Sequence, residues 1–260
     1  MQVDGRVAVV TGAGSGLGRA TVEHLASRGA AVVLVDANKD ALDEAIVQLA
    51  TLVDADRLLA LDFDVTDASA AENAADQVVD RLGAVHFNIN CAGIAPAAKV
   101  VSRRGPANLD LFAKTLAVNL TGTFNLNRVA IAAMLNNDPD ENDERGVVVN
   151  TASDAAFDGQ MGQAAYSASK AGVVGMTLPL ARDMAGKGIR VNCIAPGLFA
   201  TSMVNGMAAD IQKRLVDMIL EPKRMGRPEE FASLVEHIVT NPYLNAECIR
   251  LDAGQRMLPR

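Results

Sequence analysis

Short apolar segments rich in β-branched residues recur from one end of this chain to the other, and they limit its possible folds most. They are Val7–Thr11, Ala31–Val35, Arg57–Leu61, Val85–Asn90, Gly146–Thr151, Arg190–Ala195 and Glu247–Leu251. Between them lie stretches with helical spacing of apolar residues, namely Leu17–Ala26, Ala41–Leu52, Ala70–Leu82, Leu109–Leu135, Ala164–Ala185 and Pro228–Thr240. Apolar strands alternating with amphipathic helices are typical of a parallel sheet that is covered on both faces.

The alternation continues through all 260 residues without a linker rich in Pro, Gly or Ser. It predicts one α/β domain over residues 1–260, a doubly wound, Rossmann-like parallel sheet of about seven strands with helices on both faces. There is no long apolar run and no signal peptide, so we expect a cytoplasmic protein without a membrane partner. The net charge of −7 lacks a clustered basic run and argues against direct nucleic-acid binding.

Three segments depart from this rhythm. Asn136–Arg145 is acidic and contains a proline, which predicts a solvated loop. Pro96–Asn108 carries Lys99, Arg103 and Arg104 after a strand end, where a parallel sheet binds ligands, although it is also consistent with an ordinary solvated loop. Pro179 is expected to kink its helix or to begin a second helical segment.

Cysteine and histidine do not form a metal-binding pattern. Cys91, Cys193 and Cys248 are far apart with apolar neighbours, which favours buried thiols over a disulfide framework. The three histidines are scattered, and no pair has the spacing of metal ligands, so we expect no catalytic metal.

The glycine-rich stretch Thr11–Gly18 follows the first strand and opens a helix. Its glycines, Gly12, Gly16 and Gly18, allow a tight turn and bring bare backbone and a helix N-terminus against a pyrophosphate. Asp36 ends the next strand, where a carboxylate accepts both hydroxyls of an adenosine ribose and repels a 2′-phosphate. Together with the uncharged Ser15 and Ala37, it predicts NAD as the cofactor, in preference to NADP.

A second group of residues provides acid–base chemistry. Tyr166 and Lys170 are four residues apart and share one face of a helix. The ammonium, with the charge of an oxidised nicotinamide, is expected to lower the phenol pKa toward neutrality, so that Tyr166 exchanges a proton with a hydroxyl whose carbon exchanges hydride. Ser153, at a strand end, is expected to hold the substrate oxygen.

These residues resemble the short-chain dehydrogenase/reductase family over nearly the whole chain. The resemblance includes Asp64-Val65, Asn90–Gly93, Asn119 and Pro196-Gly197 with Thr201. It implies a catalytic tetrad of Asn119, Ser153, Tyr166 and Lys170, in which Asn119 kinks its helix and holds a water, and Lys170 grips the nicotinamide ribose. The implied cofactor-binding set is Gly12, Ser15, Gly16, Leu17, Gly18, Asp36, Asp64, Val65, Cys91, Ala92, Gly93, Tyr166, Lys170, Pro196, Gly197, Leu198 and Thr201.

Four longer stretches are similar to one group within that family, the type 2 3-hydroxyacyl-CoA dehydrogenases, also described as type 10 17β-hydroxysteroid dehydrogenases. They are Asn150–Lys170, Gly175–Asp183, Ile194–Phe199 and Asn241–Asp252. The implied reaction interconverts an (S)-3-hydroxyacyl-CoA and a 3-ketoacyl-CoA with NAD. The expected substrate contacts are Ser153, Gln160, Gln163, Phe157, Leu198, Phe199 and Met203, while the cations of Pro96–Asn108 are candidates to receive CoA.

Asn245-Ala246 and Ala253 depart from the family pattern, which has Thr-Gly and Gly there, and leave details of subunit packing open. The alternatives are a hydroxysteroid dehydrogenase, a 3-ketoacyl-carrier-protein reductase, which Asp36 disfavours, and, of another class, an NAD-binding scaffold subunit. The resemblance also implies a homotetramer. A mitochondrial matrix location remains the alternative to the cytoplasm if the source is eukaryotic.

Overall fold

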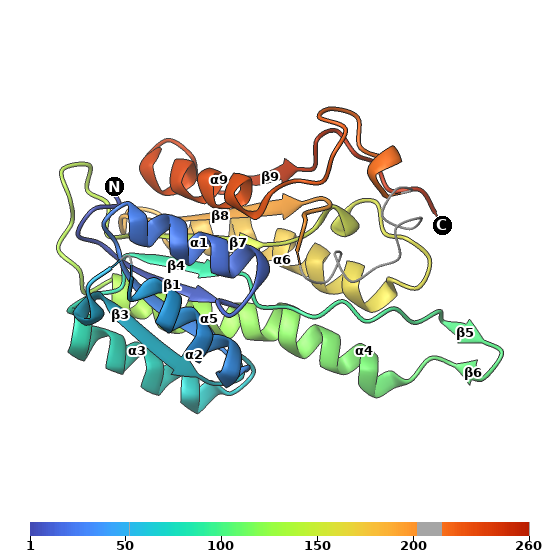
Figure 1. Ribbon diagram of the computed structural model, residues 1–260, viewed down its shortest axis with the longest axis horizontal. Coiled ribbons are helices and arrows are strands. Elements are labelled where there is room, and N and C mark those ends of the chain that lie inside the picture. Colours follow the sequence, from blue (N-terminus) through green and yellow to red (C-terminus); the bar gives the residue numbers. More distant parts are fainter. Residues whose placement is uncertain (52, 202–214, 260) are drawn as a thin grey trace.

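Seven parallel strands form the centre of the molecule in the computed structural model, which describes residues 1–51, 53–201 and 215–259 (Figure 1). The order across the sheet is β3-β2-β1-β4-β7-β8-β9. The strands are β1 (Val7–Thr11), β2 (Ala31–Asp36), β3 (Leu58–Asp62), β4 (Phe87–Asn90), β7 (Gly146–Thr151), β8 (Ile189–Pro196) and β9 (Cys248–Leu251). The chain reverses direction across the sheet between β1 and β4, as in other doubly wound folds. The predicted fold class is confirmed.

The described helices cover both faces of this sheet. They are α1 (Gly16–Ser27), α2 (Lys39–Leu49), α3 (Ala68–Leu82), α4 (Leu109–Leu116), α5 (Thr123–Met134), α6 (Ala164–Asp183) and α9 (Pro228–Thr240). Alternate residues of β1 face opposite layers: Ala8 and Val10 pack in a cluster with α1, α2 and α9, whereas Val7 and Val9 pack with α3 and α5. No helix among the described residues is long and apolar enough to cross a bilayer.

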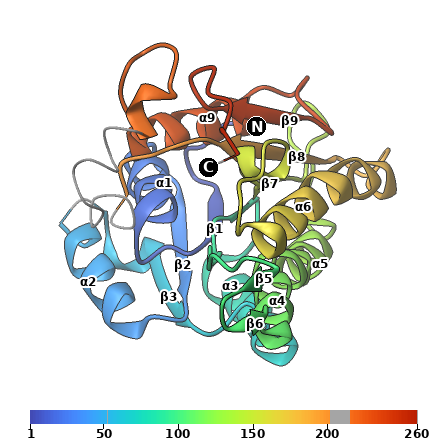
Figure 2. The ribbon, with the colours of Figure 1, turned by 90° about the vertical axis from the view of Figure 1, so that its right-hand side faces the viewer.

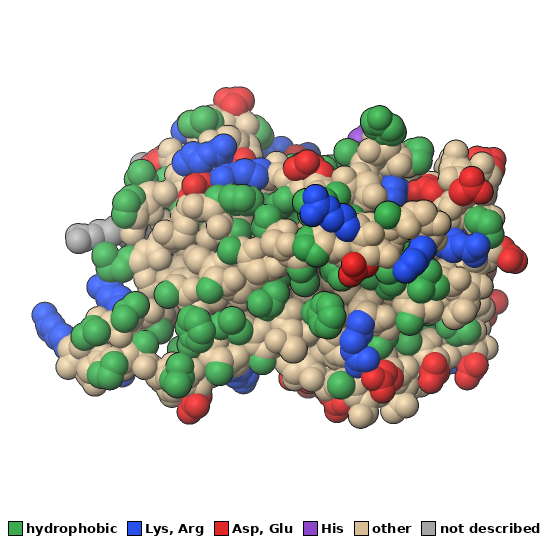
Figure 3. Space-filling model, turned by 180° about the vertical axis from the view of Figure 1, so that it is seen from behind, with side chains coloured by type: hydrophobic (Ala, Val, Ile, Leu, Met, Phe, Trp, Pro, Cys, Tyr) green, Lys and Arg blue, Asp and Glu red, His purple; other side chains and the backbone are tan. Residues whose placement is uncertain are grey.

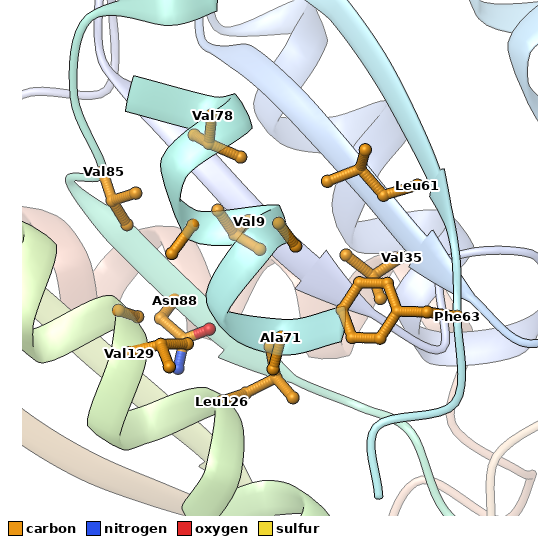
Figure 4. Close-up of a pocket in the computed structure, with 13 residues that line it drawn as sticks. Val9, Val35, Leu61, Phe63, Ala71, Val78, Val85, Asn88, Leu126 and Val129 are labelled. Carbon is orange, nitrogen blue, oxygen red and sulfur yellow. The ribbon is translucent and has the colours of Figure 1, made fainter. Parts of the chain in front are cut away.

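A small cavity remains in the α3 and α5 layer beneath β1, β2 and β3. Its volume is about 20 Å³, room for roughly one water, and apolar side chains such as Val9, Leu61, Val78 and Val129 line it (Figure 4). Asn88 is the one polar residue in that lining, and its Oδ1 has no hydrogen-bond partner in the part of the chain that the structure describes. Packing beneath this part of the sheet is therefore apolar but incomplete.

The predicted helix Leu109–Leu135 is not one uniform helix. Residues Ala117–Gly122 between α4 and α5 are π-helical, and Asn119 lies within this segment. A single extra residue in a helical turn produces such a segment, and π-helical turns often occur at functional sites. In contrast, α6 continues through Pro179 to Asp183, so Pro179 does not begin a second helical segment, and the alternative, a kink at Pro179, stays a prediction.

The segment Pro96–Asn108 forms a two-stranded antiparallel hairpin, β5 (Val101–Ser102) and β6 (Gly105–Pro106). It projects from the carboxyl edge of the sheet, in front of α4 in Figure 2. Near its base, the backbone N–H of Ala98 donates to the carbonyl of Gly162 at 2.8 Å, in the loop before α6.

The acidic segment Asn136–Arg145 is only partly the solvated loop that its composition predicts. Glu144 is buried and pairs with Arg190 and with the Met1 amine, the latter at 2.5 Å. Asn137 is also buried and donates to the carbonyls of Val85 and Arg145. A buried charge requires a paired partner. Glu144 has two of them, Arg190 and the Met1 amine, at the edge of the sheet opposite the hairpin.

Two of the positions that depart from the family pattern have a left-handed backbone. The φ angle is 63° at Ala246 and 51° at Ala253. This conformation favours glycine because it crowds a side-chain Cβ. The departures therefore place backbone strain in the chain on either side of β9.

Candidate active site

The glycine-rich turn after β1 exposes a helix N-terminus. Gly12 and Gly16 have φ angles of 65° and 53°. A Cβ on Gly18 would lie 2.2 Å from the Gly12 carbonyl oxygen, so helix and turn touch only because residue 18 has no side chain. Ser15 makes no side-chain capping bond to α1, so its side chain does not compete with an anion for the first N–H groups of the helix.

Asp36 lies at the end of β2 against this turn. Its Oδ2 accepts the backbone N–H of Gly14 at 3.0 Å, and its Oδ1 accepts that of Asn38 at 2.9 Å. These bonds fix a partly exposed carboxylate beside the glycine turn. A ribose diol that binds there would meet a ready-made acceptor.

The remaining predicted cofactor residues line the same edge of the sheet. Thr11 Oγ1 accepts the N–H groups of Cys91 and Ala92, both at 3.1 Å, and so ties the end of β1 to the segment after β4. A Cβ on Gly16 would lie 3.3 Å from Thr201, which places the chain after β8 beside the turn. Leu17, Gly93, Pro196, Gly197 and Leu198 lie along this edge, too, Leu17 just inside α1 and the others at or after strand ends.

Asp64 and Val65 play different local roles. Asp64 is exposed and its Oδ1 accepts the N–H and hydroxyl of Thr66, which stabilises the turn before α3. Val65 is buried against Gly122 in the π-helical segment, where a Cβ would come within 2.6 Å of it.

Ser153, Tyr166 and Lys170 come together at the ends of β7 and α6. Lys170 is buried, and its Nζ donates to the Thr151 carbonyl at 2.7 Å. The same Nζ lies 5.9 Å from the centre of the Tyr166 ring. Burial lowers the pKa of Lys170 to about 8.

The predicted lowering of the Tyr166 pKa by Lys170 together with an oxidised nicotinamide stays a prediction, because Lys170 by itself does not produce it. In the protein by itself, burial raises the pKa of this phenol, the neighbouring Ser153 hydroxyl lowers it, and the charge of Asp154 raises it. Lys170 instead directs its ammonium to the Thr151 carbonyl and lies near the Cys91 and Cys193 thiols. Any lowering of the phenol pKa to neutrality therefore needs a further positive charge in the site.

Asn119 connects three parts of the site through its side chain. Its Oδ1 accepts the N–H of Ile94 at 2.8 Å, and its Nδ2 donates to the Ile94 carbonyl at 2.9 Å and to Ser169 Oγ at 3.0 Å. Its backbone carbonyl accepts the Thr123 hydroxyl. The expected disturbance of the helix is present as the π-helical turn, and the water between Asn119 and Lys170 stays a prediction.

Several predicted substrate contacts have other partners. Phe199 is buried in the core, edge-on to Phe231 with ring centroids 6.3 Å apart, so its assignment to the substrate wall is wrong. Gln160 Nε2 donates to the Leu258 carbonyl, and Gln163 Oε1 accepts the Gln160 N–H.

Phe157 and Leu198 are at least partly exposed, with the Arg250 guanidinium 5.1 Å from the centre of the Phe157 ring. They remain available to a substrate. Met203 lies outside the described residues. The three cysteines are free, as expected, but only Cys193 is fully buried.

The sequence reasoning missed residues that support the site from a distance. Thr151 and Ser169 are ordinary strand and helix residues until the fold brings them to Lys170 and Asn119. Asp154, next to Ser153, is buried and accepts its hydroxyl at 3.0 Å. An acidic residue directly after a predicted catalytic serine is the sequence signal that could have identified Asp154.

The glycine turn, the carboxylate after β2 and the Ser-Tyr-Lys group all lie within residues 6–212, which match a family model described as short chain dehydrogenase. The chain belongs to the short-chain dehydrogenase family. It is thus an oxidoreductase, a dehydrogenase that uses a nicotinamide cofactor.

Relatives within the family cover almost the whole chain. The 3-hydroxyacyl-CoA dehydrogenase type-2 of Homo sapiens is 45% identical over 259 residues, 99% of this chain and 97% of that protein. Its counterpart from Drosophila melanogaster is 44% identical over 97% of this chain and 98% of its own length. A crystal structure of 3-hydroxyacyl-CoA dehydrogenase type-2 from Mycobacterium avium has a TM-score of 0.92 at 37% identity, covering 98% of both chains.

Proposed function

We propose that this short-chain dehydrogenase interconverts (S)-3-hydroxyacyl-CoA and 3-ketoacyl-CoA with NAD. The observation that carries the proposal is the juxtaposition of Ser153, Tyr166 and Lys170 at the carboxyl edge of the sheet. Relatives named for this reaction match the chain at 44% and 45% identity over nearly all of its length.

Each residue of the site has a separate task in this proposal. The Tyr166 phenol gives its proton to, or takes it from, the substrate oxygen. Ser153 binds the same oxygen and fixes its direction. Lys170, held by the Thr151 carbonyl, brings a positive charge to the phenol side of the site.

Asn119 ties the Ile94 segment to Ser169, the residue before Lys170 on α6. The nicotinamide supplies or accepts the hydride when the cofactor is bound.

The glycine cradle and Asp36 fit a dinucleotide, and Asp36 favours NAD. A carboxylate fixed by two backbone N–H groups would repel a 2′-phosphate. The test compares initial rates with NAD and NADP on one (S)-3-hydroxyacyl-CoA. We expect a strong preference for NAD, and the reverse preference would favour the carrier-protein reductase alternative.

The hairpin supports an acyl-CoA as substrate. Lys99, Arg103 and Arg104 are exposed on it, and its base is hydrogen-bonded to the loop before α6. Cations there are suited to the phosphates of CoA in a protein of net charge −7. A panel of 3-hydroxyacyl-CoAs of increasing length with one hydroxysteroid tests this assignment. Faster turnover of the steroid would favour the hydroxysteroid alternative.

A homotetramer in the cytoplasm completes the proposal. Apolar side chains such as Phe112, Phe124 and Leu178 are exposed on α4, α5 and α6. Figure 3 shows further apolar side chains, in green, on the surface of one face of the molecule. Exposed apolar surface favours association between subunits. Sedimentation of a monomer would contradict the tetramer, and cell fractionation tests the location.

A further inference from the structure

Asp154 is a buried acid in contact with a residue of the proposed catalytic site. It begins the short 3-10 turn Asp154–Ala156 after β7 and is 4% exposed. Its Oδ1 accepts the Ser153 hydroxyl at 3.0 Å, whereas its Oδ2 is buried without a hydrogen-bond partner among the described residues. A buried carboxylate with an unsatisfied oxygen is costly and calls for an explanation.

The serine hydroxyl has one hydrogen to donate, and Asp154 holds it. Ser153 Oγ already accepts the Ala155 N–H at 3.2 Å. A hydroxyl that donates to Asp154 cannot give the same hydrogen to a substrate oxygen or to a phenolate at Tyr166. Asp154 therefore competes for the hydrogen that the proposed reaction uses.

The charged groups around Asp154 do not neutralise it. Arg250 on β9 approaches this region, but its guanidinium is paired at 2.7 Å with both Asp158 and Asp252. Asp252 adds a like charge, and Tyr166 on α6 is the remaining titratable neighbour within the described ranges. Burial raises the pKa of Asp154, and its negative charge raises the pKa of Tyr166.

We propose that Asp154 is a positioning residue for the Ser153–Tyr166 pair: its carboxylate holds the serine hydroxyl hydrogen and opposes loss of the phenol proton. Neutralising Asp154 frees the Ser153 hydroxyl to stabilise a phenolate at Tyr166 and removes the repulsion between the two negative charges. Both effects make the Tyr166 phenol lose its proton more readily. The inference concerns the same site as the proposed function and rests on it for the role of the pair.

A direct test titrates the Tyr166 phenol without cofactor or substrate. The chain has two tyrosines and no tryptophan, and Tyr243 is 98% exposed. In a Tyr243→Phe background, near-ultraviolet absorbance therefore follows Tyr166 alone. We expect Asp154→Asn to lower the phenol midpoint by about one pH unit.

Asp158→Asn is the matched control because it removes the same charge from the same loop without touching Ser153. We expect it to leave the midpoint nearly unchanged. An unchanged midpoint in Asp154→Asn, or an equal fall in Asp158→Asn, would overturn the proposal. Asp154→Ser replaces the Asn variant if that variant does not fold, with the same downward shift expected.

A second arm separates charge from hydrogen bonding. In a Ser153→Ala background, Asp154→Asn is expected to lower the midpoint by less than it does when Ser153 is present. An equal shift in both backgrounds would remove Ser153 from the mechanism and overturn the proposal as stated.

A third arm uses the pH profile of kcat/KM for oxidation of an (S)-3-hydroxyacyl-CoA. Its rise with pH is expected to move down by the same amount in Asp154→Asn, and a profile that does not move would contradict the inference. A wild-type chain that does not oxidise any hydroxyacyl-CoA would defeat the proposed function, while the phenol titration would still decide the role of Asp154.

Discussion

The two halves of the sheet differ in the polarity of their buried side chains. Strands β1, β2 and β3 are almost entirely apolar between their helices and leave a small apolar cavity. Strands β4 and β7 carry the buried Asn88, Asn90 and Asn150, and Asn127 of α5 accepts both the Asn88 and Asn90 amides, at 3.0 and 2.7 Å. We call the part around β1, β2 and β3 the nucleotide half and the part around β4 and β7 the catalytic half. The nucleotide half relies on backbone shape, whereas the catalytic half relies on hydrogen bonds between buried polar side chains.

Because of this contrast, different kinds of substitution should be harmful in the two halves. A turn of bare backbone binds through its shape, so added side-chain atoms harm it. A buried polar network is sensitive to the loss of one partner, which leaves the others unpaired.

The largest expected effect is on turnover. Tyr166→Phe removes the proposed proton donor but leaves the glycine turn and Asp36 untouched, so we expect turnover to fall by about 10²- to 10⁴-fold with NAD affinity kept. Steady-state rates and a cofactor titration measure the two separately. A variant that keeps wild-type turnover would support the scaffold alternative.

Asn127→Leu tests the polar network itself. It leaves the buried Asn88 amide without its acceptor, while Asn90 keeps its bond to Asn150 at 2.9 Å. We expect a loss of about 2–4 kcal/mol in the free energy of unfolding by denaturant. In the nucleotide half, Ala75→Val extends a side chain that lines the cavity, and we expect a change within about 1 kcal/mol. Equal losses would erase the contrast.

The buried ammonium gives stability a pH dependence of known sign. The folded-state pKa of Lys170 is lowered to about 8 from 10.5, so the unfolded chain binds more protons between these two values and stability rises with pH across that window. Relative to Lys170→Met, the wild type should gain roughly 2–3 kcal/mol of unfolding free energy from about pH 7 to about pH 10. A constant difference between the two proteins over this range would contradict the burial of a charged lysine.

Gly18→Ala targets the shape of the nucleotide half. The new Cβ would lie 2.2 Å from the Gly12 carbonyl oxygen, so the turn must move. We expect NAD to bind about 10- to 100-fold more weakly, equivalent to about 1–3 kcal/mol of overpacking. Gly175→Ala is the control, because a Cβ there meets nothing within 4 Å and its backbone is not left-handed, and a cofactor titration should find its affinity unchanged.

The smallest expected effect is a gain. Ala246→Gly relieves a left-handed backbone and should raise the free energy of unfolding by about 1 kcal/mol. Thermal unfolding of the variant, compared with that of a neighbouring change such as Glu247→Gln, measures it. A lower melting temperature would show that the strain is absent or offset elsewhere.

Local patterns in the sequence predicted the nucleotide half better than the catalytic half. The glycine turn and Asp36 are close in the chain and their geometry follows from strand, turn and helix signals. The π-helical turn at Asn119, the Thr151 carbonyl at Lys170 and the core position of Phe199 depend on contacts between distant segments. The raised pKa of Tyr166 was missed for the same reason, because burial cannot be judged from a four-residue spacing.

The anchoring of Lys170 by the Thr151 carbonyl has a wider consequence. The end of β7 carries both that carbonyl and, two residues later, Ser153, while Lys99, Arg103 and Arg104 lie on a separate hairpin between β4 and α4. In the proposed function, proton transfer and CoA binding therefore depend on separate parts of the chain. Laboratory evolution aimed at new substrates should therefore vary residues 96–108, because substitutions there leave Thr151, Ser153 and Lys170 unchanged.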